Sequence, residues 1–260
     1  MRQTLKSLWA LFRIRVAGMT IYRLSFFTGF FVDCTTFLVQ LLFLRLLTRD
    51  SVGPWPPAMY ALFVGSFMTL DGLYMVTWFF GVLALPDMIR SGELDLVLVR
   101  PVRPLLYVLF SKVDLGCVPQ VALGIAITLG GAGELGCLTG ANVLLWLLSL
   151  LIMYALMAAL SLLMRLSAFW TTSSHATEQM ESTLIDAAMR LPMPAITGGY
   201  RYVLLMALPY GLAGNFPALV LAGQASAMFW LYAVAITAGF LALAAALWHK
   251  GLARYESASS

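Results

Sequence analysis

Charged residues are scarce in this sequence. Only 11% of its 260 residues are Asp, Glu, Lys or Arg, whereas 61% are hydrophobic and the mean hydropathy is +0.89. This composition excludes an ordinary soluble domain, and it excludes a disordered chain, which requires low hydrophobicity and high net charge. The apolar runs are continuous rather than alternating, which disfavours an outer-membrane barrel. We therefore predict an all-α integral membrane protein.

Signatures of catalysis and cofactor binding are also lacking. The sequence has no GxxxxGK[ST] phosphate loop and no GxGxxG, HExxH or GxSxG motif, and its two histidines, His175 and His249, are far apart. Cys34, Cys117 and Cys137 form no CxxC pair and lie in or beside apolar segments. We expect no cofactor, no metal site, no enzymatic activity and no ATP hydrolysis by this chain alone.

Six apolar runs have the length of membrane-spanning helices. At about 1.5 Å rise per residue, each covers a hydrocarbon core of roughly 30 Å. The first run is too long for a signal peptide, and no small-residue cleavage site follows it. The predicted spans are 25–46, 58–85, 105–130, 141–164, 199–222 and 226–248.

The basic residues predict the orientation. With the amino terminus inside, fourteen of the 16 Lys and Arg residues lie in inner segments, and only Arg45 and Arg49 lie outside. Cytoplasmic loops of membrane proteins carry such an excess, so both termini are expected in the cytoplasm. Because the basic residues flank apolar runs, the net charge of +4 does not indicate nucleic-acid binding.

The fifth span leaves two alternatives open. The run 199–222 contains Pro209 and Pro217, which remove helical hydrogen bonds and favour a break, so this segment is either a span or a re-entrant element. In the second case 173–193 makes the crossing, and its polar residues must face protein or a wet cavity. Two basic residues then move outside, which leaves twelve inside and four outside, and the orientation is unchanged.

Residues 1–24 combine basic and apolar side chains. This pattern predicts an interfacial helix in the inner headgroup layer that contacts anionic lipids, and the alternative is a poorly ordered basic tail. In the last span, Ala238, Ala242 and Ala246 recur at every fourth position and are expected to form a packed face, within the bundle or between subunits.

Three carboxylates lie within apolar runs. An ionisable group at membrane depth is costly and indicates a functional role by default, so Asp33, Asp71 and Asp114 are candidates for proton coupling. Asp33 and Asp114 are near the ends of their runs, where water or a partner explains them. Asp71 lies near the middle of its span and is the candidate pathway residue.

The loop at 86–104 is too polar to continue a span and too apolar for a simple linker. Pro86 and Asp87 suit a helix start, Gly92 permits a turn, and the charged residues then flank a short apolar stretch. Two Arg-Pro pairs, beginning with Arg100 and Pro101, force an extended chain before the next span. The pattern predicts a docking element for a cytoplasmic partner, although a generic interfacial helix shows the same spacing.

Several of these stretches together resemble the permease subunit of ABC-2 type ABC transporters, in the bacterial branch of about 260 residues. They are RSGELDLVLVRPVRP, AFW at 168–170, LPMPAI, the Pro209 to Pro217 segment and the terminal RYES. The resemblance implies an exporter of the type V architecture with six spans and an amino-terminal interfacial helix. It also implies a coupling helix between spans two and three, outer re-entrant helices before the last span, and pairing of two permeases with separate cytoplasmic ATPase subunits.

Individual residues carry the resemblance. The residues that match the coupling-loop motif, and that would contact the ATPase, are Gly92, Glu93, Asp95, Arg100 and Pro101. The residues that match the prolines of the outer segment are Pro192, Pro209 and Pro217. The stretch after AFW departs from the branch because it is unusually polar.

The resulting functional hypothesis is a permease subunit in the bacterial inner membrane that exports an unidentified, amphiphilic substrate. A second permease, identical or paralogous, completes a dimer, and a separate ATPase supplies energy. One alternative is a proton-coupled secondary transporter that uses Asp71 and Asp33, but the sequence shows no internal repeat of the kind such transporters contain. Another alternative is a non-catalytic membrane assembly factor.

Overall fold

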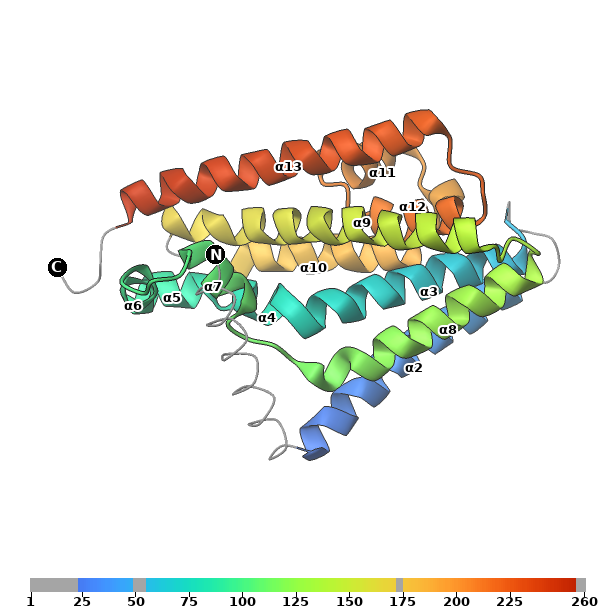
Figure 1. Ribbon diagram of the computed structural model, residues 1–260, viewed down its shortest axis with the longest axis horizontal. Coiled ribbons are helices and arrows are strands. Elements are labelled where there is room, and N and C mark those ends of the chain that lie inside the picture. Colours follow the sequence, from blue (N-terminus) through green and yellow to red (C-terminus); the bar gives the residue numbers. More distant parts are fainter. Residues whose placement is uncertain (1–22, 49–54, 172–174, 256–260) are drawn as a thin grey trace.

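A computed structural model describes residues 23–48, 55–171 and 175–255 of the chain, and every regular element in these ranges is a helix. The long helices lie beside one another along the long axis of the molecule (Figure 1). Residues 1–22 of the predicted interfacial helix at 1–24 lie outside the described residues.

Four helical stretches in the described residues are long and apolar enough to cross a membrane. They are Pro57–Ser91, Leu115–Glu134, Gly140–Phe169 and Ala227–Arg254. Within them lie α3 (Pro57–Tyr74), α8 (Val118–Glu134), α9 (Gly140–Leu166) and α13 (Ala227–Arg254), and α3 continues through a π-helical turn, η1 (Met75–Phe79), into α4 (Phe80–Leu83). The first predicted span corresponds to α2 (Arg23–Thr48), in which Cys34–Leu46 forms a shorter apolar stretch.

Helix α3 occupies the centre of the bundle. Its side chains from Ala58 to Leu70 are all buried, and the helix packs against α2, α8, α9 and the later helix α12. At the crossing with α8, a Cβ on Gly65 would lie 2.7 Å from the backbone nitrogen of Thr128, and one on Gly124 would lie 2.7 Å from that of Thr69. The two backbones are therefore in direct contact, as small residues permit between helices in lipid.

The third span begins later than predicted. The expected continuous run at 105–130 is wrong in its first part: α7 (Pro104–Phe110) is a separate short helix, and the crossing helix starts at η2 (Leu115–Cys117) and α8. Asp114 stabilises the break, because its carboxylate accepts a hydrogen bond from the Gly116 amide at 2.8 Å and its own amide donates to the Val76 carbonyl at 3.2 Å. Asp114 thus has a capping role.

The fifth apolar run is broken, as its prolines predict. A short helix, α11 (Gly198–Tyr202) with the π turn η5 (Val203–Ala207), meets α12 (Leu212–Leu221) at 84°. Helix α12 is almost wholly buried against α3 and α9. The polar segment before it forms α10 (His175–Arg190), which lies alongside α9 and is followed by η4 (Met193–Ala195) (Figure 1).

The small-residue face predicted on α13 does not pack within the chain. Ala238, Ala242 and Ala246 are exposed, whereas the buried side of α13 includes Ala233 and Ala244. The buried alanines lie on a different side of α13, and this side packs on α9. The prediction that this face packs within the chain is therefore wrong. Alanines recur along several sides of this helix, and their spacing alone does not identify the buried side.

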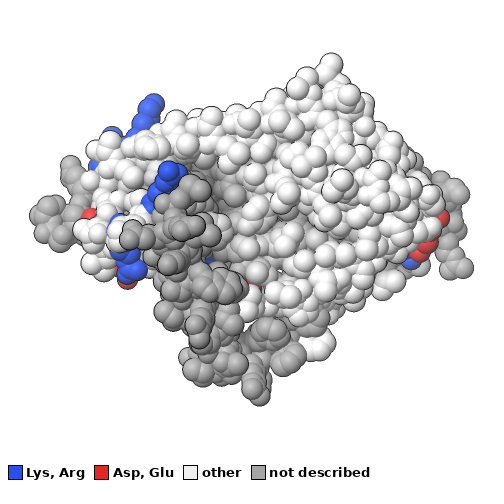
Figure 2. Space-filling view, viewed as in Figure 1, with Lys and Arg blue, Asp and Glu red and all other residues white. Residues whose placement is uncertain are grey.

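On the face shown in Figure 2, charged side chains gather at the two ends of the molecule, and a broad uncharged region lies between them. Basic residues dominate the end that carries α5 to α7 and the carboxy-terminal end of α13, among them Arg90, Arg100, Arg103, Lys250 and Arg254 (Figure 1). At the opposite end Arg45 and Glu134 form an exposed ion pair at 3.1 Å. Two polar ends with an apolar belt between them are the surface pattern of a protein that spans a bilayer.

Candidate functional site

The predicted docking element forms two short helices at the basic end of the bundle. They are α5 (Leu85–Ser91) and α6 (Glu93–Leu98), and α7 follows them. Gly92 joins α5 to α6 with a φ of +78°, a left-handed conformation that glycine adopts without steric cost. The glycine in the RSGELD motif therefore sets the angle at which α6 is presented.

Helix α6 carries apolar residues on two sides. One side packs against the bundle, and the other is exposed. Leu94 and Val97 are buried against the bundle, whereas Leu96 is 64% exposed and Val99, at the end of the helix, is 81% exposed. Exposed aliphatic residues outside the apolar belt are typical of a surface that another protein covers. The inward side fixes α6 to the bundle, and the outward side is available for a partner.

The charged residues of the motif differ in exposure. Glu93 and Arg100 are exposed, and so is Pro101, whereas Asp95 is half-buried. The Arg100 guanidinium lies over the Tyr107 ring at 4.7 Å, and its Nε donates to the Leu96 carbonyl at 3.2 Å. Glu93, Arg100 and Pro101 therefore share the outer surface with the apolar residues, while Asp95 is turned partly toward the chain itself.

An aromatic cluster connects this element to the end of α13. The ring of Phe169, from the AFW stretch, packs edge-on against Trp248 at 6.0 Å and Tyr255 at 6.2 Å. A Cβ on Gly251 would lie 2.3 Å from the Phe169 ring, so this position must be glycine for the contact to form. Burial, and next the Asp95 carboxylate, raise the pKa of Tyr255. Sequence reasoning treated AFW as a family marker only and missed this contact.

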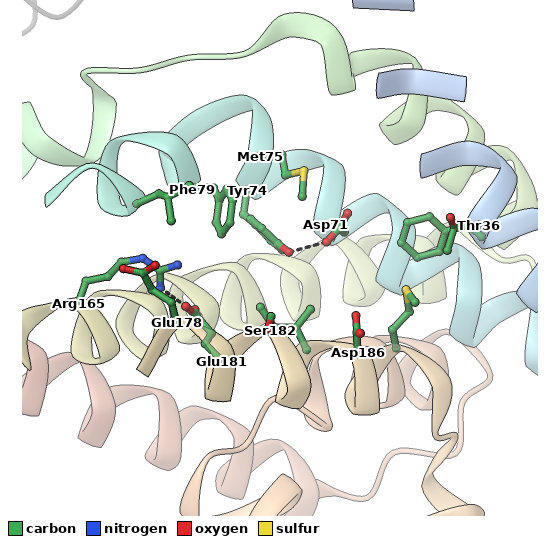
Figure 3. A pocket seen from close by; sticks show the side chains of 14 residues that line it. Thr36, Asp71, Tyr74, Met75, Phe79, Arg165, Glu178, Glu181, Ser182 and Asp186 are labelled. Atoms are coloured by element: carbon green, nitrogen blue, oxygen red, sulfur yellow. Dashed lines mark hydrogen bonds and ion pairs between the residues drawn. The ribbon is translucent and has the colours of Figure 1, made fainter. Parts of the chain in front are cut away.

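A second candidate site lies at the side of the bundle. Helices α2, α3, α9 and α10, with η1, line a partly open cavity of about 360 Å³ (Figure 3). It combines apolar and aromatic walls with a set of polar side chains. These polar residues are Asp71, Arg165, Glu178, Glu181, Ser182 and Asp186.

Asp71, the predicted pathway residue, lies in the wall of this cavity. It is only 7% exposed, and its two oxygens accept hydrogen bonds from the Tyr74 hydroxyl at 2.5 Å and from Gln120 Nε2 at 2.7 Å. These bonds offset much of the cost of burying a carboxylate. Of the other two candidates, Asp114 caps η2, and the side chain of Asp33 lies outside the described residues.

A buried ion pair closes one end of the cavity. The Arg165 guanidinium of α9 pairs with the Glu181 carboxylate of α10, and both side chains are at most 3% exposed. Glu181 also accepts hydrogen bonds from the Ser161 hydroxyl at 2.6 Å and from the Tyr210 hydroxyl at 3.1 Å. Because Tyr210 lies in the bend before α12, this cluster holds α9, α10 and the broken segment together.

Helix α10 presents a polar face to the cavity. Glu178, Ser182 and Asp186 recur at every fourth residue, so they lie on one side of the helix, and Figure 3 shows them directed toward Asp71 and Tyr74. Sequence reasoning predicted that the polar residues of this segment face protein or a wet cavity if it crosses the membrane, but it did not identify the helix face that they form. The four-residue spacing was the signal that identifies its face.

The three motif prolines lie around the broken segment. Pro192 follows α10 and begins η4, Pro209 lies in the bend, and Pro217 lies inside α12 without ending it. Asn215 of α12 stabilises this arrangement, because its Oδ1 accepts from the Met193 amide at 2.6 Å and its Nδ2 donates to the Leu191 carbonyl at 3.3 Å. The end of α10 is thus fixed to α12 by a side chain.

These features define a multi-pass helical membrane protein with a polar cavity at the side of the bundle and an apolar element displayed at its basic end. Residues 30–259 match the family model described as ABC-2 family transporter protein. Because the match covers most of the chain, the protein belongs to this family and is a membrane permease component of an ABC transporter. No curated protein and no solved structure matches the chain.

Proposed function

We propose that the chain is the membrane subunit of an ATP-driven exporter in the bacterial inner membrane. A separate cytoplasmic ATPase binds the surface formed by α5 and α6, and a second permease, identical or paralogous, completes the transporter. The observation that supports this proposal most directly is the exposed apolar side of α6 at the basic end of a bundle that belongs to the ABC-2 family. Family members are membrane components, so the energy source is expected in a partner.

The topology that follows has six crossings, made by α2, α3 with α4, α8, α9, α10 and α13. In it, α10 is the fifth crossing, and 199–222 is a re-entrant element that enters from the outside, because the 84° bend and the burial of α12 do not suit one straight span. Twelve basic residues are then cytoplasmic and four are external, with both termini inside. A membrane-impermeant thiol reagent applied to intact cells is expected to label a cysteine at Thr139 but not one at Ser91.

Coupling proceeds through contacts already present. The inward side of α6 packs on the bundle. Helix α5 follows α4 almost directly, and α4 continues from α3, the central helix of the fold. A displacement of α5 and α6 by a closing ATPase dimer is therefore transmitted to α3 and to the aromatic cluster at Phe169. Transmission needs an intact docking surface but no nucleotide site in this chain.

The test uses the permease coexpressed with the ATPase encoded beside it. Val99→Glu puts a negative charge on the exposed apolar surface, and Glu93→Lys reverses the charge beside it. Copurification of the ATPase is expected to fall at least tenfold, because the loss of one charge-assisted contact alone costs about 1.5 to 3 kcal/mol. Neither side chain is buried, so the variants retain the thermal stability of the parent.

The matched control is Glu134→Lys, which reverses an exposed charge at the opposite end of the molecule and leaves ATPase binding unchanged. Full ATPase binding and full transport by the Val99→Glu, Glu93→Lys double variant would refute the docking surface. Asp95→Asn is expected to have a smaller effect on binding than Glu93→Lys, because Asp95 faces Tyr255 and is half-buried.

A further inference from the structure

We propose that a second cavity, which lies between α2 and α10, binds a neutral amphiphile with one apolar chain and a hydrogen-bond donor in its head group, and that such molecules are the substrate class of this permease. The word substrate rests on the proposed function. The binding site itself rests on a buried amide oxygen that no described residue satisfies and on the apolar wall around it.

This cavity has a volume of about 530 Å³, which lies within the range of small-molecule sites, roughly 300 to 1,000 Å³. Its α2 wall includes Val39, Phe43 and Leu44, and the end of α10 supplies Met189. Val39 and Phe43 are also exposed on the surface of the chain, so the cavity borders hydrocarbon when α2 crosses the membrane. A ligand with an apolar chain therefore reaches it from the bilayer.

Gln40 lies in the same wall, and the orientation of its amide is fixed. Nε2 donates a hydrogen bond to the Met189 carbonyl at the end of α10. The Met193 amide, four residues further on, donates to Asn215 Oδ1 at 2.6 Å and leaves that carbonyl to the glutamine. Because a carbonyl oxygen only accepts, the amide of Gln40 cannot be turned around, and Oε1 is the atom left for another donor.

The oxygen of this amide has no donor within the described chain. Oε1 of Gln40 is buried and accepts no hydrogen bond from any described residue. The hydroxyl of Thr36, one turn away in the same wall, donates to the Val32 carbonyl at 2.9 Å and is committed there. A buried acceptor without a donor is destabilising. A ligand in this cavity that carries a hydroxyl or an N–H group satisfies it.

The charges around this cavity do not select an ion. Among the described residues of its wall Arg190 alone is charged, and its guanidinium pairs with the Asp186 carboxylate at 3.9 Å. A neutral head group avoids the cost of bringing an unpaired charge to an apolar wall. The ligand is therefore defined by a hydrogen bond to Gln40 and by contact with aliphatic and aromatic side chains.

The test uses a long-chain alcohol that carries a photoactivatable diazirine, bound to the purified full-length permease in lipid nanodiscs. Saturable labelling of α2 or α10 is expected. Dodecanol should displace this probe at a concentration about fivefold lower than dodecyl methyl ether, because the ether has the same chain but no donor. In the Gln40→Met variant, which removes the acceptor at similar volume, this difference should vanish.

Two matched variants of α2 guard against misfolding. Val39→Trp fills the cavity from an exposed position and should abolish labelling. Leu42→Trp, exposed on the same helix but not among the described residues that line either cavity, should leave labelling unchanged. Equal labelling of these two variants overturns the proposal. So does equal displacement by alcohol and ether in the parent, or stronger displacement by dodecanoate or dodecyltrimethylammonium than by dodecanol.

The assignment as substrate is tested separately, in the complex with the coexpressed ATPase. Dodecanol should stimulate ATP turnover in the Leu42→Trp complex but not in the Val39→Trp complex. Binding without stimulation identifies the ligand as a bound lipid and overturns the substrate assignment alone. Because the labelling assay contains no ATPase, a failure of the docking surface and a failure of this binding site are separate results.

Discussion

The two sides of this bundle are built by different means. Between α3 and α8 the backbones touch at Gly65 and Gly124, and hydroxyls of Thr69 and Thr128 bond to carbonyls of their own helices, so the interface is dry and closely packed. Between α2 and α10 lie two cavities, of about 360 Å³ and 530 Å³, that share Thr36 and Met189 in their walls. Dense small-residue contacts resist displacement, whereas a wall beside a cavity can move. The α3–α8 pair, with α9 packed on α3, is the scaffold, and α10 with α2 is the adaptable wall.

The largest expected effect comes from breaking the attachment of the wall to the scaffold. Arg165→Met leaves Glu181 buried without its cation, which costs about 3 to 5 kcal/mol. The melting temperature in detergent should fall strongly, and the Arg165→Met, Glu181→Met double variant should recover most of it. If the single variant melts like the parent, the ion pair does not hold α10.

The scaffold itself is tested at the helix crossing. Gly65→Ala places a Cβ 2.4 Å from the Thr128 hydroxyl and 2.7 Å from the Thr128 backbone nitrogen, so the helices must separate, at a cost of about 3 kcal/mol. Gly130→Ala lies on the partner helix α8, where the new Cβ meets no neighbouring atom within 4 Å, and it should be neutral or slightly stabilising. Equal melting of the two variants would contradict the described crossing.

A hydrogen bond across the scaffold gives a smaller effect. Trp146 Nε1 donates to the Ser66 hydroxyl at 2.9 Å, and both residues are fully buried. Ser66→Ala leaves the indole N–H without a partner and should cost about 1 to 2 kcal/mol. Ser66→Thr, which keeps the hydroxyl, tests whether the bond or the available volume matters, and retained stability in Ser66→Ala would mean that the bond contributes little.

The smallest effect is expected at the outer surface. Glu134→Gln removes the exposed ion pair with Arg45, which is worth less than about 1 kcal/mol in water. Its melting temperature and its ATPase binding should both match the parent within error. A large loss of stability would mean that this end is less exposed than described.

Sequence reasoning predicted the long apolar helices better than the polar wall helix α10. Long apolar runs predict α9 and α13 directly, and Pro209 predicts the bend before α12. The third span was predicted to begin too early because the segment from Leu105 to Phe110 is as apolar as a span. In the structure this segment forms α7, which packs against Gly81 of α4 and is separate from the crossing helix α8. The polar residues of α10 were expected to face protein or a wet cavity, but their position opposite Asp71 of α3 was not predicted, because the two segments are distant in sequence.

The central claim is that α10 lines a wet cavity while the buried part of α3 from Ala58 to Leu70 lies in a dry scaffold. In a variant with the native cysteines replaced by alanine, single cysteines at Ser182 and at Ser66 are reacted with a positively charged, water-soluble thiosulfonate in nanodiscs. The account predicts rapid modification at Ser182 and none at Ser66. Equal reactivity at the two positions, or no reaction at Ser182, would contradict it.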